Sequence, residues 1–144
     1  MASTAASVAG SPATDDLSLF RLYLLRAVYA LIAFGEGSIV VPDLFVHEAT
    51  ARGVIPAFLS GLCLLCLLGL KYPTRMLPLL LFEMAWKTIW FFSFGLPQYL
   101  SGQLPPTFGD DFPAITFGVV LMPLVIPWGY VWRQFVTAPW DRWR

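Results

Sequence analysis

One apolar segment, residues 77–97, constrains the fold of this chain more than any other, because it is long enough to cross a bilayer yet holds two opposite charges. From Pro78 it reads PLLLFEMAWKTIWFFSFGLP. As a helix it spans a hydrocarbon core about 30 Å thick. Glu83 and Lys87 stand four residues apart, so their side chains share one helical face. A lone charge at that depth costs at least about 2.5 kcal/mol. We therefore expect the two side chains to pair with each other, with another buried group or with water.

The composition assigns the whole chain to the membrane class. Apolar residues make up 58% of its 144 residues and charged residues 12%, whereas soluble proteins average about half and about a quarter. Six Trp, five Tyr and twelve Phe fit interfacial aromatic belts. The formal net charge of +0 provides no bulk field that would attract nucleic acid, so we expect no nucleic-acid partner.

Four apolar segments predict an all-α fold, a four-helix transmembrane bundle within residues 17–133. The expected spans are residues 17–41, 54–70, 77–97 and 112–133. The expected connections are residues 43–53, 71–75 and 98–111. Residues 1–16 lack a basic region before an apolar core, so we interpret them as a flexible tail without a secretory signal. Residues 134–144, rich in Trp and Arg, are expected to lie on the lipid surface.

Capping residues and prolines set the expected helix boundaries. Asp16 or Ser18 is a candidate N-cap for the first helix. Pro42 is expected to end that helix, because the residue before a proline disfavours the helical conformation. Pro123 and Pro127 are expected to kink the fourth helix.

The basic residues predict the orientation. In a four-span arrangement only Arg52 falls on one side of the membrane. The other side carries Arg21, Arg26, Lys71, Arg75, Arg133, Arg142 and Arg144. Because cytoplasmic segments carry an excess of Lys and Arg, we expect the N- and C-termini to be cytoplasmic.

A third ionisable residue, Glu36, lies within the first span and is flanked by Gly35 and Gly37. Small residues on both sides allow another helix to approach and cover the charge. At about 1.5 Å per residue, Lys87 falls in depth between Glu83 and Glu36. If the first and third helices touch, the three side chains form a ladder that is either a proton relay or polar substrate site, or a structural ion pair that fixes helix register. We take the structural role as the leading interpretation.

Cys63 and Cys66 form a Cys-x-x-Cys pair in the second span. In a four-span protein this spacing resembles that of quinone-linked disulfide oxidases. However, the pair lies in mid-helix, away from the helix N-terminus that activates thiols, and no second Cys pair is present to pass on a disulfide. We interpret both residues as small apolar side chains and keep a redox role as an alternative.

Trp86, Trp90 and Phe94 recur at four-residue spacing on the third helix. They predict either an aromatic wall that binds a quinone or lipid, or ordinary helix packing or lipid contact, which we favour.

His47 is the only histidine, and Asp43 and Glu48 flank it in the first external connection, with Asp110 and Asp111 in the other. A single His with scattered acids is a poor metal signature, so we expect a solvated loop and no metal site. No nucleotide-binding or nucleophile-elbow spacing is present.

The segments LLRAVYALIAFGEG, which starts at Leu24, and SGLCLLCLLGLKYPTRMLPLLL, which starts at Ser60, resemble the DoxX-like group of small bacterial four-helix membrane proteins. The resemblance implies a multi-pass protein of the bacterial inner membrane. It carries over no catalytic residue, because the group is functionally mixed: some members resemble small quinol-oxidase-associated subunits and others have thiol-stress roles.

These patterns predict a small non-catalytic integral membrane subunit that packs against a larger redox or energy-transducing complex, with Glu36, Glu83 and Lys87 as buried polar anchors. One alternative is a small transporter or proton-conducting protein that uses the same three residues. A second is a membrane thiol-redox protein that uses Cys63 and Cys66. The expected partners are the bilayer and other membrane subunits or further copies of the chain. We expect no cofactor bound by this chain alone, beyond contact with lipid or quinone.

Overall fold

The computed structural model describes residues 17–45 and 50–139, and over these residues the protein is helical, with no strands. Four of its helices are long and apolar enough to cross a membrane, which confirms the predicted all-α fold and its four candidate spans. They run over Leu19–Asp43, Arg52–Lys71, Leu77–Ser101 and Phe108–Val125. The remaining tails, which include the whole of the predicted 1–16 segment and residues 140–144, lie outside the described residues, as do residues 46–49 with His47 and Glu48.

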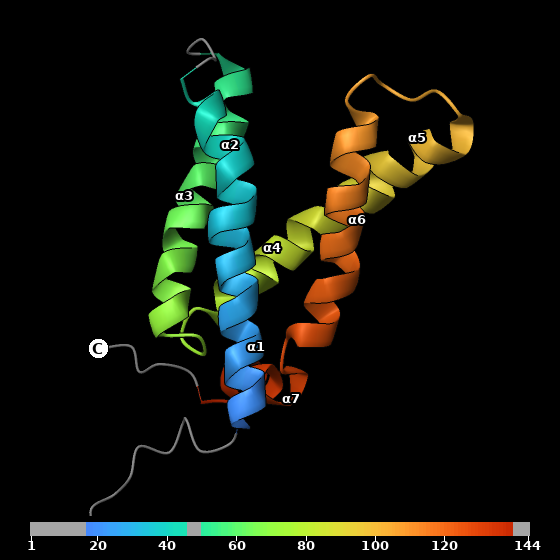
Figure 1. Ribbon diagram of the computed structural model, residues 1–144. Coiled ribbons are helices and arrows are strands. Elements are labelled where there is room, and N and C mark those ends of the chain that lie inside the picture. The colour runs from blue at the N-terminus through green and yellow to red at the C-terminus, as the bar shows by residue number, and fades with distance from the viewer. Residues whose placement is uncertain (1–16, 46–49, 140–144) are drawn as a thin grey trace, which may run out of the picture.

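The first two spans form an antiparallel pair, which we call the first hairpin (Figure 1). Its elements are α1 (Leu19–Ala30), the π-helical turn η1 (Leu31–Glu36), α2 (Gly37–Asp43) and α3 (Ala51–Lys71). Ser18 is the N-cap of α1, because its hydroxyl accepts a hydrogen bond from the Arg21 N–H at 3.3 Å. Pro42 lies inside α2 instead of preventing its last turn, since one proline removes only one backbone donor.

The other two spans form the second hairpin, in which the third helix is longer than predicted. Its elements are α4 (Leu77–Trp90), the π-helical turn η2 (Phe91–Gly95), α5 (Leu96–Ser101) and α6 (Phe108–Val125). The third span therefore continues past the predicted end at Pro97. It ends where Gly102 adopts a left-handed φ of 70°, the conformation that commonly closes a helix and that glycine adopts without strain.

The fourth span begins and ends earlier than the predicted range of 112–133. Asp110 and Asp111 belong to the first turn of α6, where the helix dipole favours acidic residues. The helix ends at Val125 because Ile126 precedes Pro127 and takes an extended conformation, with φ of −61° and ψ of 124°. Pro127 thus breaks the helix, whereas Pro123 is accommodated inside it.

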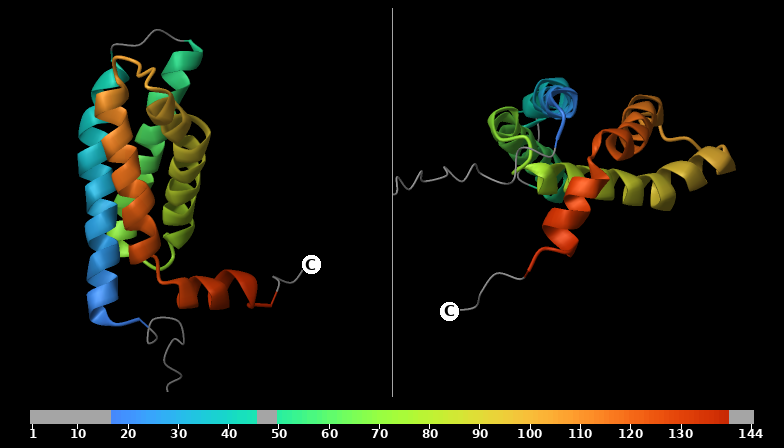
Figure 2. Two further views of the ribbon diagram at one scale, coloured as in Figure 1. Left: turned by 90° about the vertical axis from the view of Figure 1, so that its right-hand side faces the viewer. Right: turned by 90° about the horizontal axis from the view of Figure 1, so that it is seen from below.

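After this break the chain changes direction. The helix formed by α7 (Trp128–Val131) and η3 (Trp132–Val136) starts at the base of the bundle and extends sideways from it (Figure 2). The Trp128 indole N–H donates to the Pro123 carbonyl at 2.8 Å, which satisfies a group near the end of α6.

The two hairpins converge at one end of the molecule and diverge toward the other. In Figure 1, α4 slopes away from α1 and α3 as it rises towards α5, and α6 packs along α4. The fully buried side chains lie mostly near the converging end and include Leu25, Tyr29, Cys66, Leu77 and Leu80. There the Tyr29 ring lies directly on Gly69 of α3, and its hydroxyl donates to the Pro73 carbonyl at 3.0 Å.

The outer surface is largely apolar. Large hydrophobic side chains are exposed on all four spans, among them Phe20, Ile39, Leu64, Phe92 and Leu124. A water-soluble monomer does not normally expose apolar area on this scale. The surface is the one that a multi-pass membrane protein presents to lipid.

Candidate functional site

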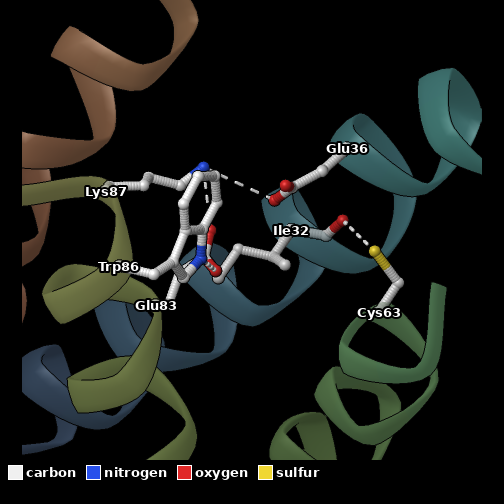
Figure 3. Close-up of polar contacts among 6 residues, drawn as sticks. All are labelled: Ile32, Glu36, Cys63, Glu83, Trp86 and Lys87. Carbon is white, nitrogen blue, oxygen red and sulfur yellow. Dashed lines mark hydrogen bonds and ion pairs between the residues drawn. The ribbon is translucent and has the colours of Figure 1, made fainter. Parts of the chain in front are cut away.

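An ion triad of Glu36, Glu83 and Lys87 links the two hairpins in the interior of the bundle (Figure 3). The Lys87 ammonium nitrogen lies 2.8 Å from Glu83 Oε1 and 3.6 Å from Glu36 Oε2. The Glu83 side chain is 0% exposed, that of Lys87 10% and that of Glu36 18%. The structure thus brings together the three residues that the sequence analysis grouped by depth, with the ammonium between the two carboxylates.

The helix α4 provides two members of the triad and a further hydrogen-bond donor, Trp86. Glu83 and Lys87 are one helical turn apart, so α4 alone brings them into contact. The Trp86 indole N–H donates to Glu83 Oε2, while the Lys87 ammonium lies 4.7 Å from the centroid of the Trp86 ring. Both oxygens of the buried Glu83 carboxylate therefore have partners, and Trp86 contacts both charges of the pair.

The helix α6 also contacts Lys87, through Gly118. A Cβ atom added at Gly118 would lie 2.6 Å from Lys87 Cδ and 3.2 Å from Cε. Only a glycine allows the backbone of α6 to lie this close to the lysine stem. Sequence reasoning missed Gly118. The available signal was an isolated glycine inside an apolar helix, which usually has a packing reason.

The π-helical turn η1 explains how Glu36 reaches α4. The Gly37 N–H donates to the Ile32 carbonyl, five residues back. This wider turn places Ile32 and Gly37 on the same face of the helix, and both are buried against α3. On that side a Cβ at Gly37 would lie 3.7 Å from Cys63 Cβ, and the Cys63 thiol donates to the Ile32 carbonyl at 3.5 Å. Because Gly37 occupies the face toward α3, its neighbour Glu36 points toward Lys87 (Figure 3). π-Helical turns often occur at functional sites.

The charges of the triad do not balance. Two carboxylates share one ammonium, so full ionisation leaves one negative charge in excess within the spanning segments, where unpaired charge is costly. One proton bound to a carboxylate would remove this excess charge. Chemically, this arrangement can fix the helix register, bind a proton, or do both.

Replacing Gly118 by alanine should weaken the link between the hairpins. The new methyl group overlaps the Lys87 stem, so either this stem or the backbone of α6 must shift, which disturbs the packing around the triad. Overpacking of this kind costs about 1–3 kcal/mol, which should lower the midpoint of thermal unfolding in detergent. Gly109→Ala, in the same helix, is the matched control, since nothing lies within 4 Å of its Cβ position. Equal midpoints for the two variants would contradict this role of Gly118.

Cys63 and Cys66 are free thiols buried between α3 and the first span, 4% and 0% exposed. The Cys63 thiol is engaged by the Ile32 carbonyl. Each packs within the apolar core cluster, to which both hairpins contribute, in the manner of a small apolar side chain.

Trp86, Trp90 and Phe94 do not share one environment. Trp86 is half-buried against the ion triad. Trp90 covers Gly95, where an added Cβ would lie 2.7 Å from its ring. Phe94 lies in η2 and is 59% exposed. The wider turn of η2 changes the phase of the helix after Trp90, so four-residue spacing no longer places Phe94 on the same face.

The described residues contain no candidate metal site, and the comparisons with known proteins found no match. Within residues 17–45 and 50–139, no group of three or more His, Cys, Asp or Glu side chains is placed to hold a metal ion. The predicted environment of His47 and Glu48 lies outside those residues. No family model, no curated protein and no solved structure matches this chain.

Proposed function

We propose that the protein is a small non-catalytic subunit of a larger membrane assembly, and that the ion triad holds its two hairpins together at the surface that meets a partner. The observation that carries this proposal is the uneven cover of the triad. The chain buries Glu83 completely but leaves 18% of the Glu36 side chain exposed within a spanning segment. Ionisable groups at that depth face protein or water and not acyl chains. A partner helix would complete the cover of Glu36.

The divergence of the hairpins supports the same function. The hairpins separate toward α2 and α5 (Figure 1), and apolar residues such as Ile39 are exposed on the part of the first span that follows Glu36. The resemblance to DoxX-like proteins favours a redox or energy-transducing complex in a bacterial inner membrane as the assembly. The excess of basic residues at the converging end favours cytoplasmic termini.

A photo-crosslinking amino acid at Ile39 should test this proposal in native membranes. Ile39 is three residues from Glu36, so it lies near the same face, and it is 70% exposed. We expect an adduct with a different membrane protein and migration of the solubilised chain in an assembly larger than itself. The matched control is Leu64, 67% exposed on α3, where we expect lipid contact and no such adduct. A chain that runs alone, or adducts only with a second copy, would contradict the subunit proposal.

The unbalanced charge of the triad favours one second candidate, a proton-conducting or transport protein. The same purified chain separates the two. Proton flux into liposomes that disappears in Glu36→Gln, with folding retained, would support conduction. A non-catalytic subunit, in contrast, should conduct no protons in liposomes and should retain its partner in native membranes. A thiol-redox function gains little support, because buried thiols such as Cys63 and Cys66 are poorly placed to attack a substrate disulfide.

A further inference from the structure

The converging end of the bundle gathers three basic side chains from two segments of the chain: Arg26, Lys71 and Arg75, here called the basic cluster. Arg26 lies on α1, Lys71 ends α3, and Arg75 lies in the turn before α4. Lys71 and Arg75 are exposed and flank one ring, with the Lys71 ammonium 5.3 Å and the Arg75 guanidinium carbon 5.8 Å from the centroid of Tyr72. Both cations thus lie against the same aromatic side chain.

Hydrogen bonds fix the backbone that carries these cations. Arg26 Nε donates to the Leu70 carbonyl at 3.0 Å, and the Tyr29 hydroxyl donates to the Pro73 carbonyl at 3.0 Å. The Tyr72 N–H donates to the Leu68 carbonyl at 2.8 Å. The turn between α3 and α4 is therefore anchored on α1, so a ligand of the basic cluster does not have to order the loop first.

The charge of the basic cluster is not balanced by acids of the described chain. Over residues 17–45 and 50–139, the acids other than the triad are Asp43, Asp110 and Asp111, all in the helix ends at the diverging end. The two ion pairs of Lys87 are made with the triad carboxylates and not with the basic cluster. The basic cluster is therefore a local concentration of positive charge that is complementary to an anion.

The level of the basic cluster relative to the membrane identifies the kind of anion. The helix formed by α7 and η3 starts at the same end of the bundle (Figure 2). Its Trp128 and Trp132 side chains are 47% and 62% exposed, and exposed Trp is typical of the headgroup region. The basic cluster thus lies at the foot of the spanning helices, where the phosphates of lipid headgroups lie, and basic groups between helices at this level bind anionic headgroups.

We propose that the basic cluster binds the phosphate of an anionic phospholipid, of the phosphatidylglycerol or cardiolipin class, from the leaflet around the converging end. Lys71 and Arg75 contact the phosphate oxygens as charge-assisted donors. Arg26, which is fixed by Leu70, adds a third positive charge from the neighbouring helix. The acyl chains lie against the exposed apolar side chains of α3, among them Leu67 and Leu68.

The full chain in nanodiscs allows a direct test with phosphatidylglycerol as the probe. We expect added phosphatidylglycerol to raise the midpoint of thermal unfolding above that in phosphatidylcholine, and the lipid to remain bound in native mass spectrometry. Lys71→Gln with Arg75→Gln should weaken its binding by about tenfold or more, from the loss of two surface charges. The matched control is Arg52→Gln, which removes an exposed charge from the opposite end of the same helix and should leave binding unchanged.

Several results would overturn the proposal. One is equal phosphatidylglycerol binding in wild type and in the double variant. Another is an equal loss in Arg52→Gln, which would mean general charge attraction. A third is equal stabilisation by inorganic phosphate, which would indicate a soluble anion as the ligand. If the double variant unfolds in phosphatidylcholine, Lys71→Gln alone should still show a smaller loss of binding, and unchanged binding there would also contradict the site.

Discussion

Replacing Lys87 by methionine is expected to destabilise the protein strongly, and adding Glu83→Gln to restore much of the lost stability. Methionine keeps an unbranched apolar stem against Gly118, so the main change is the loss of the ammonium. The Glu83 carboxylate, 0% exposed, then loses its 2.8 Å ion pair. Removing one partner of a buried ion pair costs about 3–5 kcal/mol, a large fraction of the stability of a small domain, typically about 5–15 kcal/mol.

The rescue distinguishes electrostatics from packing. Neutralising Glu83 in the Lys87→Met background removes the stranded charge, and the Trp86 indole N–H still has a side-chain oxygen to bind. Glu36→Gln in the same background should rescue less, because Glu36 is partly exposed and lies farther from the ammonium, at 3.6 Å. The measurements are membrane yield and the midpoint of thermal unfolding in detergent. If Lys87→Met and Lys87→Met with Glu83→Gln were equally damaged, the ion pair would not be what stabilises this site.

Replacing Gly69 by alanine is expected to produce the second large effect, through packing alone. A Cβ atom at this position overlaps the ring of Tyr29, which is 0% exposed. The ring cannot move freely, since its hydroxyl is bound to the Pro73 carbonyl. The methyl group must therefore separate α3 from α1 or break that hydrogen bond, so we expect a loss at the upper end of the usual overpacking range of about 1–3 kcal/mol.

Gly61→Ala is the matched control for this prediction, as it lies in the same helix and has nothing within 4 Å of its Cβ position. That substitution should stabilise the protein by about 0.5–1 kcal/mol, because alanine favours a helix interior over glycine. Thermal unfolding in detergent should therefore show midpoints that move in opposite directions. Tyr29→Leu should reduce the penalty of Gly69→Ala by making room, and a penalty of the same size in that background would show that the ring is not the obstacle.

The number of spans and the approximate depth of the charged residues in the membrane were predictable, because both depend only on the order of residues along the chain. Hydropathy and length determine which segments can cross a bilayer, and a rise of about 1.5 Å per residue orders Glu36, Lys87 and Glu83 by depth. The helix ends were less predictable. Proline identity alone does not say that the chain continues through Pro42 and Pro97 but breaks before Pro127, since that outcome depends on what packs against each turn.

The contacts of the candidate site were less predictable still, because they depend on rotation about the helix axes. A π-helical turn inserts one extra residue into a turn. The sequence LIAFGE contains no pattern that predicts such a turn. Without knowledge of that turn, one cannot derive which helical face carries Glu36, and so whether it points toward Cys63 or toward Lys87. The four-residue spacing of Trp86, Trp90 and Phe94 was interpreted mainly as ordinary packing, and it did not indicate that the Trp86 indole N–H binds Glu83. A tryptophan three residues after a buried carboxylate was the overlooked signal.

The linkage of the two hairpins through Lys87 has a consequence for biogenesis. The chain leaves the ribosome N-terminus first, so the first hairpin enters the bilayer with Glu36 before its counter-ion has been synthesised. The second hairpin, by contrast, carries the neutral combination of Glu83 and Lys87 on one helix and can insert already compensated. Insertion of the separate helices would then precede their docking. The final docking step also pairs Glu36 with Lys87. This ion pair therefore favours association of the two hairpins over their separation.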